Sequence, residues 1–384
     1  MSRVATLAVF LLVPFVTEAQ APRSAALGKA TARAKDVLSL VTTVRELRNG
    51  DLMVADPIER QVMVFGASLQ SRRVLGKEGG GPGEYRQPDA VWPMPADSTL
   101  VVDLGNARLS ILGPTGVYAR SIPMASGGAG GPVGVMFPGG VDAQGRVYFQ
   151  PPAGGGPGGL PDSANIMRFD PKAGTTQAVA KAKTPDLDRQ ESGGENSRQV
   201  RIRPIPLSAS DGWAVAPNGD VAVARSGMYR MDWVSNGVTR SGPAVAATRA
   251  KIGEAEKREW VQQQMLTGGI TMNVEDNNGQ RTMSFGRARP QQEPTTDGYK
   301  WPATKPPFEA TSLRVDATGR VWVRRLGPAN APRQYDVFNA SGAHVATVNF
   351  PAGRVLLGFG ASALYAAEVD ADGQYFLERY ALPL

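Results

Sequence analysis

The chain has 384 residues, of which 42% are hydrophobic and 20% are charged, so it can bury a large core and lacks a disordered composition. Its 45 glycines and 30 prolines favour a protein with many turns. Cysteine is absent and only one histidine is present, which excludes disulfides, thiol catalysis, cysteine-ligated zinc and a histidine-rich metal site. The net charge of +7 indicates a mildly basic solvated surface, with polyanion binding as the less favoured alternative.

The first residues predict a secretory signal peptide over residues 1–19. Arg3 supplies a positive charge, residues 4–16 form a short apolar run broken by Pro14, and small residues precede a cleavage site after Ala19. The apolar run is too short for a membrane span, and no later stretch reaches about 18 apolar residues. We therefore expect a bacterial periplasmic or secreted protein, monomeric, with no transmembrane segment after signal cleavage.

Residues 20–384 are predicted to form one domain, because one phrase recurs along them. Each copy has a turn with Asp, Asn or Gly, a short apolar strand, a gap, and a second strand ending near a glycine. Short strands rich in β-branched and aromatic residues, separated by turn residues, are typical of all-β proteins. In chain order the copies begin near Asn49, Asp97, Asp142, Pro217, Asp316 and Ala361.

Copies with apolar residues on both strand faces predict a six-bladed β-propeller of four-stranded antiparallel blades, because a closed ring protects the edges of its sheets. The sixth copy ends at Leu384 after only three strands. We expect part of residues 24–41, which include the apolar stretch 37–41, to pair with the last blade and close the ring.

Residues 243–308, between the fourth and fifth copies, are predicted to be an inter-blade insertion containing a helix and a hairpin. The helix is expected over Thr248 to Leu266, with an imperfect apolar stripe. Residues 270–274 and 281–285 alternate around Asp276-Asn-Asn-Gly279. This pattern favours a hairpin turn over a calcium loop, because the remaining ligands of such a loop are missing.

Two stretches resemble a known family. Residues 76–85 (GKEGGGPGEY), with Pro88 and the pattern Val-Asp-x-Gly-Asn-x-Arg at 102–108, resemble bacterial exported six-bladed β-propellers related to NHL repeats. Residues 305–323 (KPPFEATSLRVDATGRVWV) resemble the fifth blade of the same family. The resemblance covers about residues 40–384 and departs at 150–161, 183–208 and 243–300. It implies the fold but no single activity, because propellers host binding scaffolds and several enzyme classes.

The predicted blade topology places every long connection on one face of the ring. Loops between strands two and three share a face with the connections between blades, whereas the one–two and three–four turns share the other face. Since long loops on a rigid scaffold commonly carry binding sites, we expect them to roof one mouth of the central channel. These long loops are residues 76–87, 123–139, 150–164, 183–209 and 243–308.

The end of the second strand in each blade supplies the candidate channel-mouth positions. Arginines among acids do not suit a bare divalent cation, so we expect no metal; they suit paired charges or a polar ligand with an anionic end. The alternative for the aspartates is turn anchoring by backbone N–H groups, and for the arginines it is salt bridging to neighbouring blades. The positions are Asp56, Asp103, Gln150, Arg225, Arg324 or Arg325, and Glu368.

Trp213 completes the candidate ligand-binding set, near the basic residues Arg198, Arg201 and Arg203 at the entry to blade four. Such surfaces bind RNA in some NHL-type propellers, but sparse aromatic interleaving and the expected export lead us to expect no nucleic-acid partner. The single histidine, His344, follows a short turn on the face opposite the long loops, which disfavours a histidine-dependent hydrolase. We predict no catalytic residue and no cofactor.

The sequence therefore favours an exported, non-enzymatic binding module or scaffold that recognises a protein or an envelope glycan through the long-loop face. The alternative is a propeller enzyme, a lactonase, lyase or hydrolase, with a carboxylate and arginine site at the channel mouth. The glycine loop 76–83 does not indicate a phosphate site, because it lacks the Gly-Lys-Ser/Thr ending and a following helix.

Overall fold

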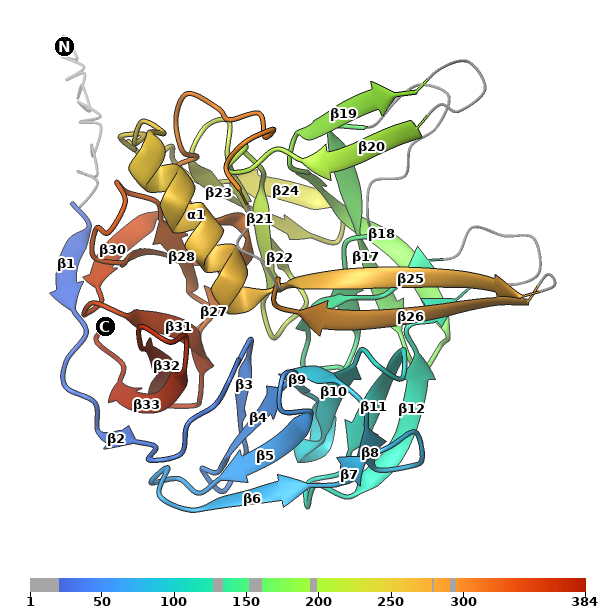
Figure 1. Cartoon of the computed structure of the whole chain (residues 1–384). Helices are drawn as coiled ribbons and strands as arrows, with labels where there is room; N and C mark the ends of the chain where they lie inside the picture. The colour runs from blue at the N-terminus through green and yellow to red at the C-terminus, as the bar shows by residue number, and fades with distance from the viewer. Residues whose placement is uncertain (1–20, 127–133, 152–160, 194–198, 278–279, 291–294) are drawn as a thin grey trace, which may run out of the picture.

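The strands form six blades around a central channel (Figure 1). The computed structural model describes residues 21–384 except 127–133, 152–160, 194–198, 278–279 and 291–294. The predicted signal peptide, Arg198 and most of the Gly/Pro-rich stretch 150–161 therefore lie outside the described residues. The first strand of each blade lines the channel, and the following strands lie progressively outward. The predicted six-bladed architecture is confirmed.

The blades follow one another in chain order. Blade one contains β3 (Val44–Glu46), β4 (Leu52–Asp56), β5 (Gln61–Phe65) and β6 (Arg72–Leu75), and blade two contains β9 (Pro88–Pro93), β10 (Thr99–Asp103), β11 (Arg108–Leu112) and β12 (Tyr118–Pro123). Blade three contains β15 (Pro138–Val141), β16 (Val147–Phe149), β17 (Ser163–Asp170) and β18 (Thr175–Lys183). Blade four contains β21 (Gly212–Val215), β22 (Val221–Arg225), β23 (Arg230–Ser235) and β24 (Val238–Ser241). Blade five contains β27 (Arg314–Val315), β28 (Val321–Arg325), β29 (Gln334–Phe338) and β30 (His344–Asn349), and blade six contains β31 (Arg354–Phe359), β32 (Ala363–Val369) and β33 (Tyr375–Ala381).

The N-terminal segment closes the ring, as predicted. Strand β2 (Ala32–Arg33) pairs antiparallel with β33 and supplies the outer strand of blade six. Leu38 forms a further antiparallel bridge with Tyr375, and its side chain is 1% exposed. One pairing was not predicted: β1 (Arg23–Ala26) adds a fifth strand to blade five, parallel to β30. The N-terminal segment therefore pairs with the outer strand of blade five and with the last strand of blade six.

Apolar clusters fill the spaces between adjacent blades in the described part of the chain, one at each of the six interfaces. Within β4, Leu52 and Val54 pack toward blade six, whereas Met53 and Ala55 pack toward blade two. Successive residues of a strand point to opposite faces, so a blade between two neighbours needs apolar residues at every position. This explains why these strands are continuous apolar runs.

The turn before the second strand uses one recurring device in blades three and five. In Asp142-Ala-Gln-Gly-Arg146, the carboxylate of Asp142 accepts hydrogen bonds from the backbone N–H groups of Gln144 and Arg146 and from the Arg146 side chain. The phenol of Tyr148 donates to the same carboxylate. Asp316 accepts an equivalent set in blade five. The repeated Asp-x-x-Gly-Arg phrase therefore encodes a buried turn anchor.

The insertion between β24 and β27 contains α1 (Glu254–Thr267) and a hairpin of β25 (Gly269–Asn277) and β26 (Gln280–Ala288). The helix begins six residues later than the expected Thr248. Gly253 occupies the N-cap position, and its N–H donates to the Glu256 carboxylate, so the helix starts there. The hairpin is longer than predicted. None of the helices in the described part of the chain has the length and apolar composition that a bilayer-spanning helix needs.

The remaining connections carry short paired strands. A hairpin of β19 (Leu187–Ser192) and β20 (Gln199–Pro204) precedes blade four, and the sequence did not reveal it. It places Arg201 and Arg203 on β20, in a projecting connection and not in the blade itself. The shorter elements are β7 (Lys77–Glu78), β8 (Glu84–Tyr85), β13 (Ala125–Ser126), β14 (Gly134–Val135), and the 3-10 helices η1 (Pro95–Asp97) and η2 (Ala310–Ser312).

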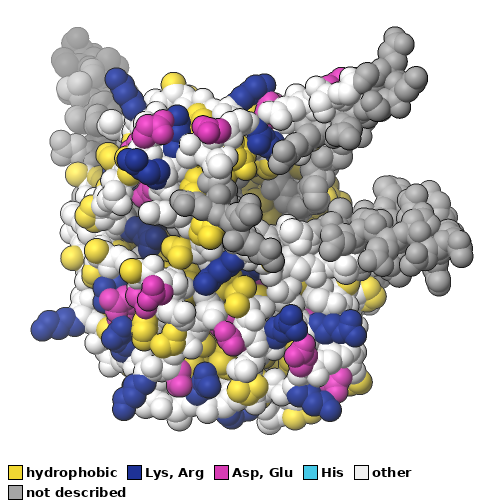
Figure 2. Space-filling model, in the orientation of Figure 1, with side chains coloured by type: hydrophobic (Ala, Val, Ile, Leu, Met, Phe, Trp, Pro, Cys, Tyr) yellow, Lys and Arg dark blue, Asp and Glu magenta, His cyan; other side chains and the backbone are white. Residues whose placement is uncertain are grey.

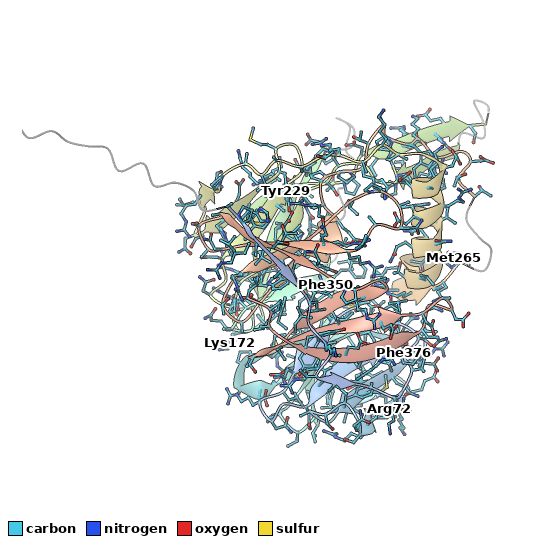
Figure 3. All side chains as sticks on the ribbon, turned by 90° about the vertical axis from the view of Figure 1, so that its left-hand side faces the viewer. Arg72, Lys172, Tyr229, Met265, Phe350 and Phe376 are labelled. Atoms are coloured by element: carbon cyan, nitrogen blue, oxygen red, sulfur yellow. The ribbon has the colours of Figure 1, made fainter. Side chains whose placement is uncertain are left out.

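The long connections gather on one face of the ring, which we call the long-loop face; the opposite side is the short-turn face. Figure 1 shows α1 and the β25–β26 hairpin lying across the long-loop face. In the side view of Figure 3, Met265 of α1 lies on one side of the ring, and Lys172, in the turn between β17 and β18, lies on the other.

Leu38→Ala tests ring closure. Removing this buried side chain should lower the free energy of unfolding by about 2–5 kcal/mol, because it leaves a cavity at the junction of the first and last blades. Among the blade strands, β33 should show the largest increase in the hydrogen-exchange rate of its backbone amides. Val37→Ala is the matched control, since Val37 is 44% exposed and its truncation should change stability by less than about 0.5 kcal/mol. Equal effects of the two substitutions would contradict this account of closure.

Candidate functional site

The central channel contains two adjacent cavities, and we call the wall that they share the waist. The first, of about 430 Å³, lies toward the long-loop face and is called the roofed cavity. The second, of about 550 Å³, lies toward the short-turn face and is called the open cavity. The waist consists of the residues that line both: Thr43, Trp92, Gly139, Leu313 and Arg314.

Aromatic side chains from first strands and connections wall the roofed cavity. Trp213 of β21 lies against Gly139 of β15, where a methyl group would come 2.5 Å from the indole ring. Glycine is therefore required for this close approach between blades three and four. Phe137 forms an edge-to-face pair with Phe285 of the hairpin, with ring centroids 5.2 Å apart. The cavity thus has rigid apolar walls contributed by separate blades.

The base of the β25–β26 hairpin forms the roof. Ile270 and Arg287 line the cavity from above, although they lie far along the chain from blades two and three. The amide side chain of Gln87 donates to the Arg287 carbonyl at 2.6 Å and accepts from the Arg287 N–H at 2.8 Å. The Arg287 guanidinium also donates two hydrogen bonds to the Asp89 carboxylate, from Nε at 2.5 Å and from Nη2 at 3.2 Å. These contacts fasten the roof to blade two.

Helix α1 and the end of the hairpin are fastened to the other side of the ring. Arg289 donates to the backbone carbonyls of Leu266, Ser39 and Gly373. Glu256 accepts the N–H of Ala329, in the connection between β28 and β29. The insertion therefore spans the channel mouth and is attached on both sides.

Arg314, at the waist, has an unusual environment. Its Nε donates to the Leu357 carbonyl, its Nη1 to the carbonyls of Thr311 and Leu313, and its Nη2 to that of Thr42, at 2.9–3.3 Å. Burial lowers the pKa of Arg314 from its ordinary range, but a guanidinium stays protonated in proteins. No carboxylate pairs with it within the described residues. A positive charge is thus held in the channel by neutral partners.

The other ionisable groups on the roofed cavity are paired. Asp89 pairs with Arg287, as described above. Asp211 pairs with Arg225 at 3.0 Å and accepts the N–H and hydroxyl of Ser226. The Lys183 ammonium lies 2.5 Å from the Asp186 carboxylate and 2.7 Å from the Ala209 carbonyl.

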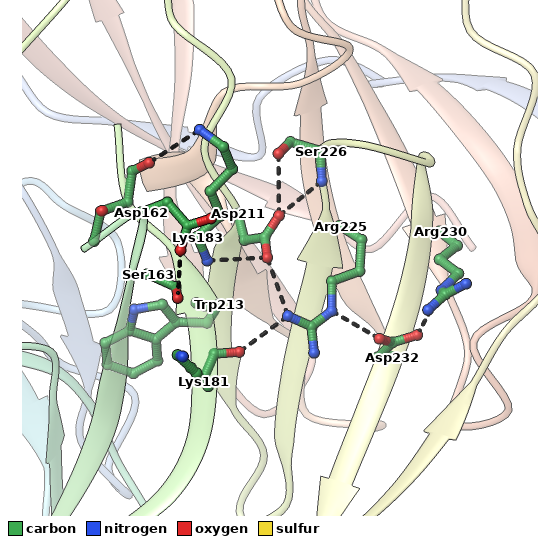
Figure 4. Close-up of polar contacts among 12 residues, drawn as sticks. Asp162, Ser163, Lys181, Lys183, Asp211, Trp213, Arg225, Ser226, Arg230 and Asp232 are labelled. Carbon is green, nitrogen blue, oxygen red and sulfur yellow. Dashed lines mark hydrogen bonds and ion pairs between the residues drawn. The ribbon is translucent and has the colours of Figure 1, made fainter. Parts of the chain in front are cut away.

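Arg225, a predicted site residue, lies at the centre of a blade-four network (Figure 4). Its guanidinium joins Asp211 and Asp232, at 3.0 and 2.7 Å, and donates to the Lys181 carbonyl of blade three. Burial would raise the pKa of Asp232, but hydrogen bonds from Arg225, Ser241 and Arg230 outweigh it and lower that pKa. This geometry matches the salt-bridging alternative for Arg225.

Asp56 and Asp103 both accept hydrogen bonds that hold connections between strands. Each is 0% exposed. Asp56 accepts backbone N–H groups of Ser39, Ile58 and Glu59 at 2.7–3.1 Å, and burial is the main cause that raises its pKa. Asp103 accepts backbone N–H groups of residues 86 and 87 and the amide of residue 106. Asp56 matches the turn-anchoring alternative predicted from sequence, whereas the backbone groups bound by Asp103 belong to the connection before β9 and only the Asn106 side chain comes from the following turn.

The remaining predicted positions are also in ion pairs. Arg324 pairs with Glu309 at 2.8 Å, and Glu368 pairs with Arg33 at 2.6 Å. Arg325 joins Asp336 at 2.9 Å. His344, at the start of β30, lies 3.2 Å from the Asp336 carboxylate. Burial would raise the pKa of Asp336, but the contacts with His344 and Arg325 outweigh it and lower that pKa.

Of the seven predicted ligand-binding residues, Trp213 lines the roofed cavity, and the other six are absent from the walls of both cavities. Gln150, from the same series of positions, does line it and accepts the indole N–H of Trp213 at 3.2 Å. Sequence reasoning missed Asp89, Arg287 and Arg314. Asp89 and Arg314 could have been found from blade topology, because they lie on first strands, which face the channel. No local sequence pattern indicated that Arg287 reaches the cavity.

The glycine loop 76–83 folds onto its own neighbours. The Glu84 carboxylate accepts the Gly81 N–H at 2.8 Å, which lowers the pKa of Glu84. The Arg108 side chain donates to the carbonyls of Gly80, Gly81 and Glu84. At Gly76 the backbone has φ +72°, and a methyl group would lie 2.2 Å from the Gly83 carbonyl oxygen. The loop is a structural junction between blades one and two.

Charge on the long-loop face is mixed. Figure 2 shows basic and acidic side chains interspersed there, with no single basic patch on the surface in view. Among the described side chains, no group of three or more His, Asp or Glu residues gathers as a metal-holding cluster.

No family model and no curated protein matches the chain. Solved structures with a similar fold include a proposed gluconolactonase, with 13% identity, TM-score 0.44, and coverage of 94% of this chain and 97% of that one. They also include a member of the DUF4221 family from Bacteroides vulgatus, with 10% identity, TM-score 0.45, and coverage of 94% and 99%. A proposed exported protein from Bacteroides fragilis has 10% identity, TM-score 0.41, and coverage of 94% of each chain. These values carry no inference about function, and the fold assignment rests on the strand pairing described above.

Asp232→Asn tests the structural reading of Arg225. The folded-state pKa of Asp232 is lowered, so its ion pairs stabilise the protein above its unfolded pKa of about 3.9 and are lost as the pH falls through the folded value. The variant should lose roughly 1–3 kcal/mol at pH 7 and show a shallower decline in stability below about pH 4. Denaturant melts across pH measure both effects. Exposed Asp372→Asn is the control, and an identical pH profile for Asp232→Asn and wild type would contradict the assignment.

Proposed function

We propose that the protein is a ligand-binding β-propeller whose binding site is the roofed cavity. The observation that carries this proposal is the combination of a channel-end cavity of about 430 Å³ with a roof fastened on both sides of the ring. Cavities of roughly 300–1,000 Å³ with apolar walls and a few convergent polar groups are typical of small-molecule sites.

The walls define what such a ligand needs. Trp213, Phe137 and Leu313 offer apolar surface, which favours an aromatic or aliphatic body. Gln150 and Ser210 add neutral hydrogen-bonding groups. A ligand of this kind would be enclosed by blades below and by Ile270 and the Arg287 backbone above.

The site narrows the expectation from sequence that a protein or an envelope glycan binds the long-loop face. The cavity accommodates a small molecule, or the end of a peptide or glycan chain, and does not itself provide a broad docking surface. We retain as proposals the export by a signal peptide over 1–19, a single domain over 20–384 and the relationship to NHL-type propellers. With export, the protein would bind its ligand outside the cytoplasm.

An enzyme working in the same cavity is the second candidate. Its support is that the carboxylates of Asp89 and Asp211 and the ammonium group of Lys183 all line the cavity. Each of these three groups is held in an ion pair. This pairing disfavours a role as general acid or base, because such a group must exchange a proton with the substrate. Turnover in a lactone, ester and lyase substrate panel that disappears in Lys183→Met, with stability unchanged, would favour the enzyme over the binding module.

Ile270→Glu tests the proposed site with N-phenyl-1-naphthylamine, a neutral aromatic probe that fluoresces in apolar surroundings. Wild type should bind the probe, and a carboxylate in the roof should weaken binding by about tenfold or more, because apolar burial of this size contributes roughly 1.5–3 kcal/mol. The matched control is Ile202→Glu, since Ile270 is 41% exposed and lines the cavity whereas Ile202 is 46% exposed on β20 and does not.

Equal affinities of the two variants would show that the probe binds elsewhere. No saturable binding of the neutral probe to folded wild type would count against a small-molecule site in the roofed cavity.

A further inference from the structure

The channel wall has an excess of hydrogen-bond donors. Among buried side-chain atoms without a partner in the described structure, those on the channel wall are Nε and Nη1 of Arg45 and Nε1 of Trp92. All three are donors, and no channel-wall acceptor is left in the same state. Leaving a buried donor unpaired costs about 1–3 kcal/mol, so groups of this kind call for an acceptor from outside the chain.

Trp92 and Arg314 bring such donors together at the waist. Both residues line the roofed and the open cavity. A guanidinium carries five N–H groups, and Arg314 uses four of them on backbone carbonyls, which leaves one on Nη2. An unused indole N–H and an unused guanidinium N–H therefore belong to two residues that line both cavities.

The charges around the waist also favour an anionic ligand. Asp89, Asp211 and Asp142 on the channel wall are neutralised by Arg287, Arg225 and Arg146, at 2.5, 3.0 and 2.6 Å. Arg314 makes no ion pair among the described residues, and Glu309, the carboxylate that favours its charged form from a distance, is itself paired with Arg324 at 2.8 Å. In a channel with restricted access to water, an uncompensated charge acts more strongly than it would at the surface.

Arg45 adds two further unpaired N–H donors on the open-cavity side, although its charge is paired with Asp97. Its side chain is 4% exposed, and Nη2 pairs with Asp97 at 2.6 Å while Nε and Nη1 have no acceptor. Asp97 is presented by a turn in which Ala96 and Asp97 both have positive φ, 56° and 59°. A backbone conformation that is costly for these residues thus holds a carboxylate against Arg45, which fixes the guanidinium at the wall.

We propose that the waist is an anion subsite, so that the ligand of the roofed cavity has an apolar body and one anionic end bound by Arg314 and Trp92. This inference rests on the proposed function, because it uses the same cavity and adds the chemical class of its ligand. The anionic end is a carboxylate, sulfonate or phosphate-type group.

A matched pair of probes isolates the charge. N-phenyl-1-naphthylamine and 8-anilinonaphthalene-1-sulfonate share the same aromatic body and differ by a sulfonate. Fluorescence titrations at about 0.5 M salt suppress binding to exposed cations, because the screening length falls to roughly 4 Å. Wild type should prefer the sulfonated probe by roughly 10- to 100-fold, the range expected for a hydrogen bond to a charged group.

Arg314→Gln should remove that preference and leave the affinity for the neutral probe within about twofold. Trp92→Phe keeps an aromatic side chain, although a smaller one, and removes the N–H. It should reduce the preference by roughly 3- to 10-fold, and it keeps the proposal testable if the Arg314 variant fails to fold. Exposed Arg120→Gln is the control and should change neither affinity.

Three outcomes decide between the claims. Loss of the preference in Arg314→Gln, with a smaller reduction in Trp92→Phe and no change in Arg120→Gln, supports the anion subsite. Binding of the neutral probe with equal affinity for the sulfonate, or a preference that survives both Arg314→Gln and Trp92→Phe, overturns the subsite and leaves the proposed function standing. Binding of neither probe overturns both.

Discussion

The burial of both faces of every blade is the constraint on which the structure depends. Each interface between blades holds its own apolar cluster, and Leu52 and Met53, adjacent in one strand, belong to two different clusters. Such an arrangement is stable only if the ring closes, because an open end would expose an entire apolar face. The N-terminal segment provides that closure through β2 and Leu38, at the junction where the first and last blades meet.

Closure also explains where ligand chemistry can be located. A ring of fixed blades leaves a channel of fixed shape, and its first strands place Trp92, Trp213 and Arg314 on the wall without any of them needing to move. The insertion adds the element that the ring lacks, a cover, and the reciprocal hydrogen bonds between Gln87 and Arg287 attach it. A ligand bound there as proposed would not spend binding energy on ordering the walls, which is the advantage of a preformed site.

Much of the fold follows from local sequence, and much of the site does not. The recurring turn phrases, the strands that are apolar on both faces and the missing strand of the last blade predicted the propeller and its closure. The β19–β20 hairpin was missed, and the helix was predicted to start six residues too early, because Gly253 was not taken as the N-cap. Candidate residues were sought at the ends of second strands, where Asp56 anchors the following turn and Asp103 binds the connection before β9. The roof depends on a contact between residues 200 positions apart, which no local pattern contains.

The most direct test of the account is a crystal structure of the protein purified from its own cells without added ligand. The account predicts continuous density in the roofed cavity, packed against Trp213 beneath Ile270, with a polar end directed at Arg314. A cavity that contains only ordered water, or a ligand bound on the outer blade surfaces, would contradict it.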